Sequence, residues 1–202
     1  SNSSADCGDV PAGSFSGPGA SAPTPCSIGT WQDQAGQSSC MNASVGHYVD
    51  TNGSTTQTPC GLGTWNNMTG QAACTPASPG HYVDTNGSAV QTPCGLGTWN
   101  NMSGQASCTN ASAGHYVDTN GSTSETPCDA GTYNPSNGSN SSSDCGDVPA
   151  GSFSGPGASA PTPCSIGTWQ DQAGQSSCMN ASVGHYVDTN GSTTQTPCGL
   201  GT

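Results

Sequence analysis

The segment from Cys60 to Cys94 reads Cys60-Gly-Leu-Gly-Thr-Trp-Asn-Asn-Met-Thr-Gly-Gln-Ala-Ala-Cys74, then Thr-Pro-Ala77-Ser-Pro-Gly-His-Tyr-Val-Asp-Thr-Asn-Gly-Ser-Ala-Val-Gln91-Thr-Pro-Cys94. It holds two copies of one 17-residue unit, because Gly63-Thr64-Trp65 in the first half is matched by Gly80-His81-Tyr82 in the second. Self-similarity at a fixed period is the sequence signature of a repeat architecture. We therefore take this 34-residue block as the element from which the rest of the chain is built.

The same period runs through nearly the whole 202-residue chain. Every aromatic residue follows Gly-x, at spacings of 16 or 17 residues with one longer step of 20. A longer period lies above this one, since residues 1–64 recur as 139–202 with a single difference and give a super-repeat of 138 residues. We expect the sequence to be a window on a longer array. The aromatics are Phe15, Trp31, Tyr48, Trp65, Tyr82, Trp99, Tyr116, Tyr133, Phe153, Trp169 and Tyr186.

Units that carry a cysteine pair alternate with units that carry none. This alternation divides the chain into repeats that each hold one unit of either kind. The repeat at 111–147 is longer because Ser, Asn and Gly residues stretch its cysteine unit. The segments are 1–9, the end of a truncated unit; repeats 10–42, 43–76, 77–110, 111–147 and 148–180; and a truncated repeat, 181–202.

The composition argues against one large hydrophobic core. Only 30% of the residues are hydrophobic and 6% are charged, while 30 are Gly and 15 are Pro. Ordering the backbone costs roughly 1–2 kcal/mol per residue, which so little apolar surface cannot offset. Low apolar content can also indicate disorder. The 12 regularly spaced cysteines instead favour a disulfide scaffold in a secreted or cell-surface protein.

The charge is entirely acidic, at −12 with no Lys or Arg. Phosphate contacts need cationic side chains, so nucleic-acid binding and attachment to an anionic membrane surface are excluded. No run of about 18 apolar residues is present, so the sequence predicts no membrane-spanning helix. The first residues, Ser-Asn-Ser-Ser, lack the features of a signal peptide, which we expect to be absent or already removed.

The repeat unit has the local pattern of a short β-hairpin. Gly and Pro recur too often for helices. In one unit, Asn86-Gly87 stands between extended residues, which is a strong hairpin signal. The fold class we predict is all-β and irregular: a disulfide-rich tandem-repeat rod of short β-hairpin units, each burying one aromatic side chain against its neighbours.

Two cysteine pairings are compatible with the spacing. Local pairing joins Cys60 to Cys74, and bridging pairing joins Cys74 to Cys94 across the cysteine-free unit. In that unit the equivalent positions are Ala77 and Gln91, so both cysteines are lost together, as expected if they pair with each other. Local pairing is favoured, although sequence alone does not fix connectivity. It gives Cys26–Cys40, Cys60–Cys74, Cys94–Cys108, Cys128–Cys145 and Cys164–Cys178, with Cys7 and Cys198 paired outside the sequence.

These motifs resemble a known family. Cys60-Gly-Leu-Gly-Thr-Trp with Cys74, and Gln91-Thr-Pro-Cys94-Gly-Leu-Gly, resemble the ephrin-receptor-like cysteine-rich repeats. The opening module of tumour necrosis factor receptor repeats is similar. The resemblance implies a rod-like extracellular module, as found in microbial and algal surface proteins and in components of extracellular filaments. This sequence departs from the family pattern regularly, because every second unit lacks the cysteine pair.

Most asparagines stand in Asn-x-Ser/Thr sequons, the acceptor motif for N-glycosylation in secreted proteins. They fall at the hairpin tip, at the Trp turn and at the junction between units, and copying of one accidental motif does not explain all three places. We therefore expect N-linked glycans, and the Ser, Thr and Pro content would also allow O-linked glycans. The sequons are Asn2, Asn42, Asn52, Asn67, Asn86, Asn101, Asn110, Asn120, Asn137, Asn140, Asn180 and Asn190.

No residue pattern predicts catalysis or a cofactor. The histidines recur once per repeat in Gly-His-Tyr-Val-Asp, without the close spacing of a zinc site. Asp50-Thr-Asn-Gly resembles only half of a calcium loop and is better interpreted as a turn. We therefore expect a protein that is not an enzyme and has no metal site and no cofactor.

The near-identity of the two ends favours a structural role. The function we predict is a structural subunit of a heavily glycosylated extracellular filament or cell-surface stalk. Its partners would be covalent glycans and further copies or continuations of the same array, without nucleic acid or membrane insertion. The alternative is a receptor-like or adhesin ectodomain that binds a protein or glycan ligand, and ice binding through the Thr-rich hairpins is a weaker third possibility.

Overall fold

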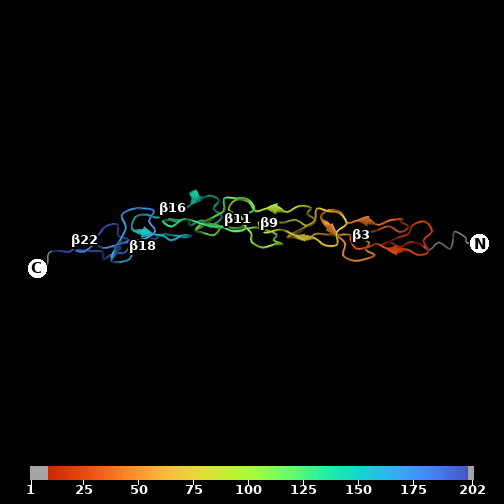
Figure 1. Ribbon diagram of the computed structural model, residues 1–202, viewed down its shortest axis with the longest axis horizontal. Helices are drawn as coiled ribbons and strands as arrows, with labels where there is room; N and C mark the ends of the chain where they lie inside the picture. Colours follow the sequence, from red (N-terminus) through yellow and green to blue (C-terminus); the bar gives the residue numbers. More distant parts are fainter. Residues whose placement is uncertain (1–8, 200–202) are drawn as a thin grey trace, which may run out of the picture. The chain divides into compact units, whose positions relative to one another are not determined.

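The computed structural model describes residues 9–199 and consists of short antiparallel hairpins joined by loops. Figure 1 shows the strands as short arrows along the chain. The predicted fold class is confirmed: this is an all-β, disulfide-rich tandem repeat. The chain clusters into two compact parts, which among the described residues are 9–93 with 102–107, and 94–101 with 108–199.

Each hairpin consists of two strands of two residues each. The first strand ends in the aromatic residue of its unit, and β-branched and aromatic residues suit the extended backbone. The second strand often ends in Pro, which is tolerated because a two-stranded sheet has only edge strands. The pairs are β1 (Ser14–Phe15) with β2 (Thr24–Pro25), β3 (Thr30–Trp31) with β4 (Met41–Asn42), β5 (His47–Tyr48) with β6 (Thr58–Pro59), β7 (Thr64–Trp65) with β8 (Thr75–Pro76), β9 (His81–Tyr82) with β10 (Thr92–Pro93), β11 (Thr98–Trp99) with β12 (Thr109–Asn110), β13 (His115–Tyr116) with β14 (Thr126–Pro127), β15 (Thr132–Tyr133) with β16 (Gly146–Asp147), β17 (Ser152–Phe153) with β18 (Thr162–Pro163), β19 (Thr168–Trp169) with β20 (Met179–Asn180), and β21 (His185–Tyr186) with β22 (Thr196–Pro197).

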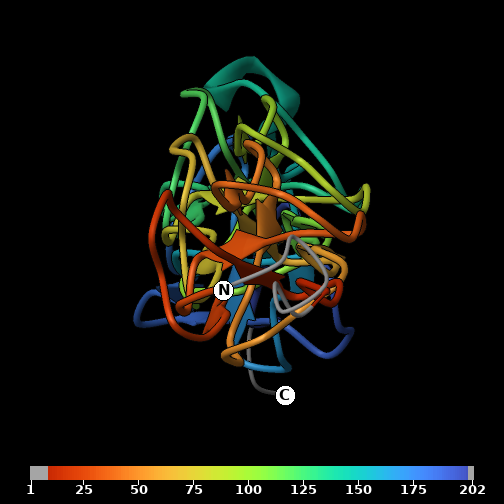
Figure 2. The same ribbon diagram turned by 90° about the vertical axis from the view of Figure 1, so that its right-hand side faces the viewer.

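One short helical turn interrupts this pattern. The 3₁₀ turn η2 (Ser142–Asp144) lies between β15 and β16, where the unit is stretched, and is drawn as a teal ribbon in Figure 2. The Ser141 side chain caps it by accepting a hydrogen bond from the backbone N–H of Ser143. The extra residues of this unit are therefore absorbed in a loop without breaking the hairpin.

The loop of each hairpin is longer and differently built than the Asn-Gly signal suggests. Between β9 and β10, Gly87 has φ of 73°, but no described residue other than glycine has a positive φ. A type I′ hairpin turn needs positive φ at both central residues, so Asn86-Gly87 does not form one. Instead, the loop forms a hydrogen bond with the preceding unit, because the Gly87 N–H donates to the carbonyl of Cys60 at 2.8 Å.

Neighbouring units are joined by repeated backbone hydrogen bonds. The Gly46 N–H donates to Asn66 O at 2.7 Å, and the Gly70 N–H donates back to Ala43 O at 2.8 Å. In the second compact part, Gly114 and Gly138 make the same bonds to Asn134 and Ala111, both at 2.7 Å. Because these bonds involve only the backbone, units of different sequence can stack in the same way.

The contacts also reach the unit after next. A Cβ atom added to Gly46 would overlap the carbonyl oxygen of Gly87, two units further along. Gly46 itself has φ of 75°. This position must therefore be glycine both for its backbone conformation and for the close approach of a second backbone.

The buried positions are not the aromatic ones. The aromatic side chains are half-buried, and Tyr186 is 45% exposed. Instead, most of the buried residues are either the first residue of a unit or the residue after the aromatic, as with Cys60 at 0% and Asn66 at 4%. The prediction that each unit buries its aromatic ring is therefore wrong, because the residue next to the ring points inward. Described residues of this kind are Cys26, Gln32, Ala43, Val49, Cys60, Asn66, Ala77, Val83, Cys94, Asn100, Ala111, Val117, Cys128, Asn134, Val148, Ser154, Cys164, Gln170 and Val187.

Two copies of one sequence show that burial depends on the units that follow. Residues 43–57 and 181–195 are identical. Val45 is 44% exposed, whereas Val183 is 103% exposed, and only the former is followed by further complete units among the described residues. A single unit therefore does not cover its own surface, as expected for a repeat protein.

Candidate functional site

The described disulfides all lie within single units. Cα–Cα distances are 5.7–5.8 Å, in the usual range for disulfides. Cys198 is exposed and not bonded within the described residues, and Cys7 lies outside them. The pairs are Cys26–Cys40, Cys60–Cys74, Cys94–Cys108, Cys128–Cys145 and Cys164–Cys178.

The cysteine-free units that carry Gln or Glu at the second cysteine position close the same loop with hydrogen bonds, an arrangement that we call the clasp. In the unit from 43 to 59, the Gln57 side chain replaces the second cysteine. Its Oε1 accepts from the Ser44 N–H at 2.7 Å, and its Nε2 donates to the Ser44 Oγ at 3.3 Å. Gln91 binds Ser78 in the same way, at 2.7 and 3.4 Å. The clasp thus takes the place of the disulfide, and each of its hydrogen bonds contributes about 1 kcal/mol to the free energy of unfolding.

One clasp is charged. Glu125 is the only glutamate in the chain and stands where other units have Gln. Its carboxylate accepts from the Ser112 N–H at 2.7 Å and from the Ser112 Oγ at 2.6 Å, and His115 Nδ1 lies 3.9 Å away. Partial burial raises the pKa of Glu125. The two hydrogen bonds from Ser112 and the nearby His115 lower this pKa by more than burial raises it, so the net pKa lies below its ordinary value.

This charged clasp predicts a local dependence on pH. The folded-state pKa of Glu125 is depressed, so its contribution to stability is present above the ordinary glutamate pKa of about 4.3 and is lost as pH falls through the folded pKa. We expect amide hydrogen exchange in 111–127 to speed up in acid, after correction for intrinsic rates. Glu125→Gln restores the neutral clasp and should remove this effect. Equal acid sensitivity in both proteins would contradict the assignment.

The sequon asparagines and the other asparagines lie in opposite environments. Every described sequon asparagine is exposed, whereas Asn66, Asn100 and Asn134 are 4%, 5% and 1% exposed and are not sequons. Asn66 and Asn100 are not sequons because Met stands two residues later in place of Ser or Thr, and Asn134 is not one because the next residue is Pro. Asn2 lies outside the described residues. The exposed set is Asn42, Asn52, Asn67, Asn86, Asn101, Asn110, Asn120, Asn137, Asn140, Asn180 and Asn190.

The buried asparagines have a structural task that sequence reasoning missed. Asn66 Nδ2 donates to His47 O at 3.1 Å in the preceding unit, and its Oδ1 accepts from the Met68 N–H at 3.3 Å. Asn134 Nδ2 donates to Ser139 Oγ at 2.6 Å. The absence of a sequon at just these asparagines was a signal in the sequence that could have located them.

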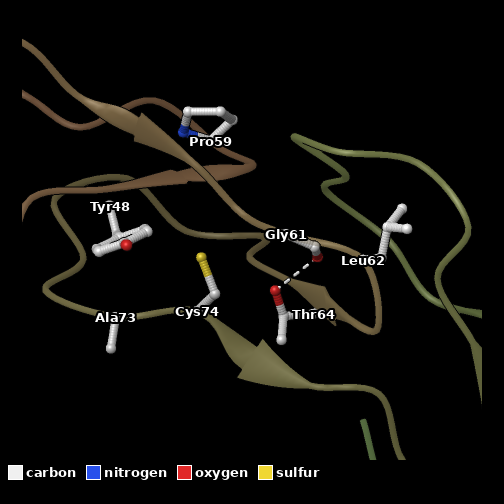
Figure 3. A pocket seen from close by; sticks show the side chains of 7 residues that line it. All are labelled: Tyr48, Pro59, Gly61, Leu62, Thr64, Ala73 and Cys74. Carbon is white, nitrogen blue, oxygen red and sulfur yellow. Dashed lines mark hydrogen bonds between the residues drawn. The ribbon is translucent and has the colours of Figure 1, made fainter. Parts of the chain in front are cut away.

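A shallow groove of about 520 Å³ lies where two neighbouring units of the first compact part meet (Figure 3). Its lining is mostly apolar, with an aromatic ring from one unit and an aliphatic side chain from the next. Thr64 Oγ1 donates to the carbonyl of Gly61 at 2.7 Å and so uses its hydroxyl locally. The lining residues are Tyr48, Pro59, Gly61, Leu62, Thr64, Ala73 and Cys74.

The side chains that could bind metal do not gather. Among residues 9–199, no three His, Cys, Asp or Glu side chains come together in an arrangement that could hold a metal ion. The repeated histidines instead lie in the first strand of their hairpins. Within the same residues, no helix has both the length and the apolar character needed to cross a membrane.

The hairpins and local disulfides define a class of protein, the disulfide-rich extracellular repeat modules. Within this class, a family model described as "Tyrosine-protein kinase ephrin type A/B receptor-like" matches residues 13–60 and 151–198. The resemblance to ephrin-receptor-like cysteine-rich repeats is thereby confirmed, and the chain contains two matched stretches of this family. They are 138 residues apart and so occupy equivalent places in the super-repeat. No curated protein matches the chain.

Proposed function

We propose that this chain is part of a structural subunit of an extracellular, N-glycosylated filament or cell-surface stalk. The observation that carries the proposal is the repeated interface between units. Gly46 with Asn66 and Gly114 with Asn134 join different sequences through the same backbone hydrogen bonds. Such an interface can be propagated indefinitely along one chain or between chains, which suits a load-bearing array.

The surface chemistry supports the same role. The net charge is −12, and exposed sequons occur along the array. Like charges repel, and bulky sugars block the pairing of exposed strand edges. Covalent glycans and self-association or chain continuation are therefore the partners that we propose, without an enzymatic activity.

Electron microscopy of the native secreted material tests this function. We expect long, uniform filaments with a regular surface texture. Single short particles that stay separate at high concentration would contradict the filament role.

A second candidate function is a receptor-like or adhesin ectodomain, which the apolar groove beside Tyr48 and Leu62 favours (Figure 3). The half-buried Tyr48 ring and the apolar side chains that line the groove can accept the apolar face of a sugar or a peptide side chain. Binding to a glycan or peptide array that is lost on Tyr48→Ala would support this candidate. Unchanged binding by the Tyr48→Ala protein would count against it.

A further inference from the structure

Three exposed sequon asparagines, which we call the bend asparagines, share one geometry. Asn52, Asn137 and Asn190 each precede a glycine with positive φ, at 74°, 74° and 73°. Each side chain reaches back to the backbone of the preceding unit. Each asparagine and the backbone that it contacts lie within the same compact part.

The contact fixes which way each amide faces. The Ile28 N–H donates to Asn52 Oδ1 at 3.0 Å. The Ala113 N–H donates to Asn137 Oδ1 at 2.8 Å, and the Ile166 N–H donates to Asn190 Oδ1 at 3.1 Å. A backbone amide can only donate, so the oxygen must face it and Nδ2 must occupy the other branch of the planar side chain.

Nδ2 is the atom that carries an N-linked glycan. The buried Asn66 and Asn134 use Nδ2 as a donor inside the protein and are not sequons. The bend asparagines use only Oδ1 for their contact with the preceding unit. An N-linked glycan leaves the amide oxygen in place, so modification and this hydrogen bond are compatible.

We propose that Asn52, Asn137 and Asn190 carry N-linked glycans whose first sugar is held in a fixed orientation by the hydrogen bond from the preceding unit to Oδ1. The inference rests on the extracellular role proposed above. The donor is a lipid-linked glycosyl diphosphate. Nδ2 forms a bond to the anomeric carbon, the bond from that carbon to the diphosphate oxygen breaks, and the diphosphate leaves with its electron pair. Nδ2 releases one proton and keeps the other.

The fixed orientation places sugar beside exposed apolar side chains. Ile28 and Ile166, whose backbone amides hold Asn52 and Asn190, are 49% and 65% exposed. A glycan on the neighbouring amide shields these side chains from other chains. Asn67 is also an exposed sequon but makes no such contact with the backbone of another unit, so it serves as the matched control.

The test uses the full chain secreted from a eukaryotic host. Peptide-N-glycosidase in heavy-oxygen water converts each glycosylated Asn to a labelled Asp, and mass spectrometry of the peptides then locates the sites. We expect label at all three bend asparagines. Absence of label at these sites would overturn the proposal.

Hydrogen exchange of the Ile28 amide tests the orientation. The glycosylated protein and the enzymatically deglycosylated protein should protect this amide equally, because Asp retains an oxygen acceptor. Asn52→Ala should speed its exchange by roughly tenfold, and Asn67→Ala should not. No change on Asn52→Ala would overturn the fixed orientation. Filaments whose glycans are at other asparagines would overturn this inference alone, and glycans at these three sites on a protein that forms no filaments would overturn only the filament role.

Discussion

Gly46→Ala should strongly destabilise the units around it. The alanine Cβ would overlap the Gly87 carbonyl, and the φ of 75° at Gly46 is unfavourable for any residue with a side chain. We expect a local loss of about 3–5 kcal/mol, since neither backbone can move without breaking its hydrogen bonds. Hydrogen exchange across 43–91 measures the effect.

The matched control is Gly61→Ala, in the unit that begins at Cys60. A Cβ atom at Gly61 has no heavy atom within 4 Å, and its φ is not positive. This variant should exchange like the wild type. If Gly46→Ala also left hydrogen exchange unchanged, the contact between a unit and the unit after next would not exist in solution.

Replacing one disulfide by a clasp should cost less than deleting it. Cys26→Ala with Cys40→Gln places Gln opposite Ser27, in the relation that Gln57 has to Ser44. Loss of the disulfide costs about 3 kcal/mol in the chain-entropy model. Cys26→Ala with Cys40→Ala removes the bond without supplying a clasp, and we expect it to be less stable than the Gln variant by about 1 kcal/mol.

Hydrogen exchange in 26–42 at increasing denaturant concentration measures the difference between these two variants. Equal stability would show that Gln at this position does not replace the disulfide. The comparison is internal to one unit, so stability differences between units do not affect it.

The sequence predicted the features that repeat and missed those set by neighbouring units. Gly-x-aromatic at a fixed period located every hairpin, because the two-residue strands coincide with it. Joint loss of the cysteines indicated a structural relation between positions such as Ala77 and Gln91. It did not reveal the clasp, because Gln91 binds Ser78, one residue beyond the cysteine position.

The burial pattern could not be predicted from hydrophobicity alone. Asn66 is polar and yet buried, because its amide is bonded to the preceding unit. The aromatic Trp65 beside it is only half-buried. The tight Asn-Gly turn was likewise overridden, since the Gly87 N–H is engaged with another unit. Each miss involves a contact between units, which a pattern within one unit does not encode.

Peptide mapping without reduction tests the central claim, that each disulfide closes a single unit. The chain has no Lys or Arg, so cleavage must be directed to the N-terminal side of aspartate, with sugars removed only afterwards. Asp50, Asp84 and Asp118 then delimit peptides 50–83 and 84–117, which hold Cys60 with Cys74 and Cys94 with Cys108. We expect each peptide to appear alone, two hydrogens lighter than its reduced form. A cross-linked pair of these peptides, joined through Cys74 and Cys94, would contradict the account.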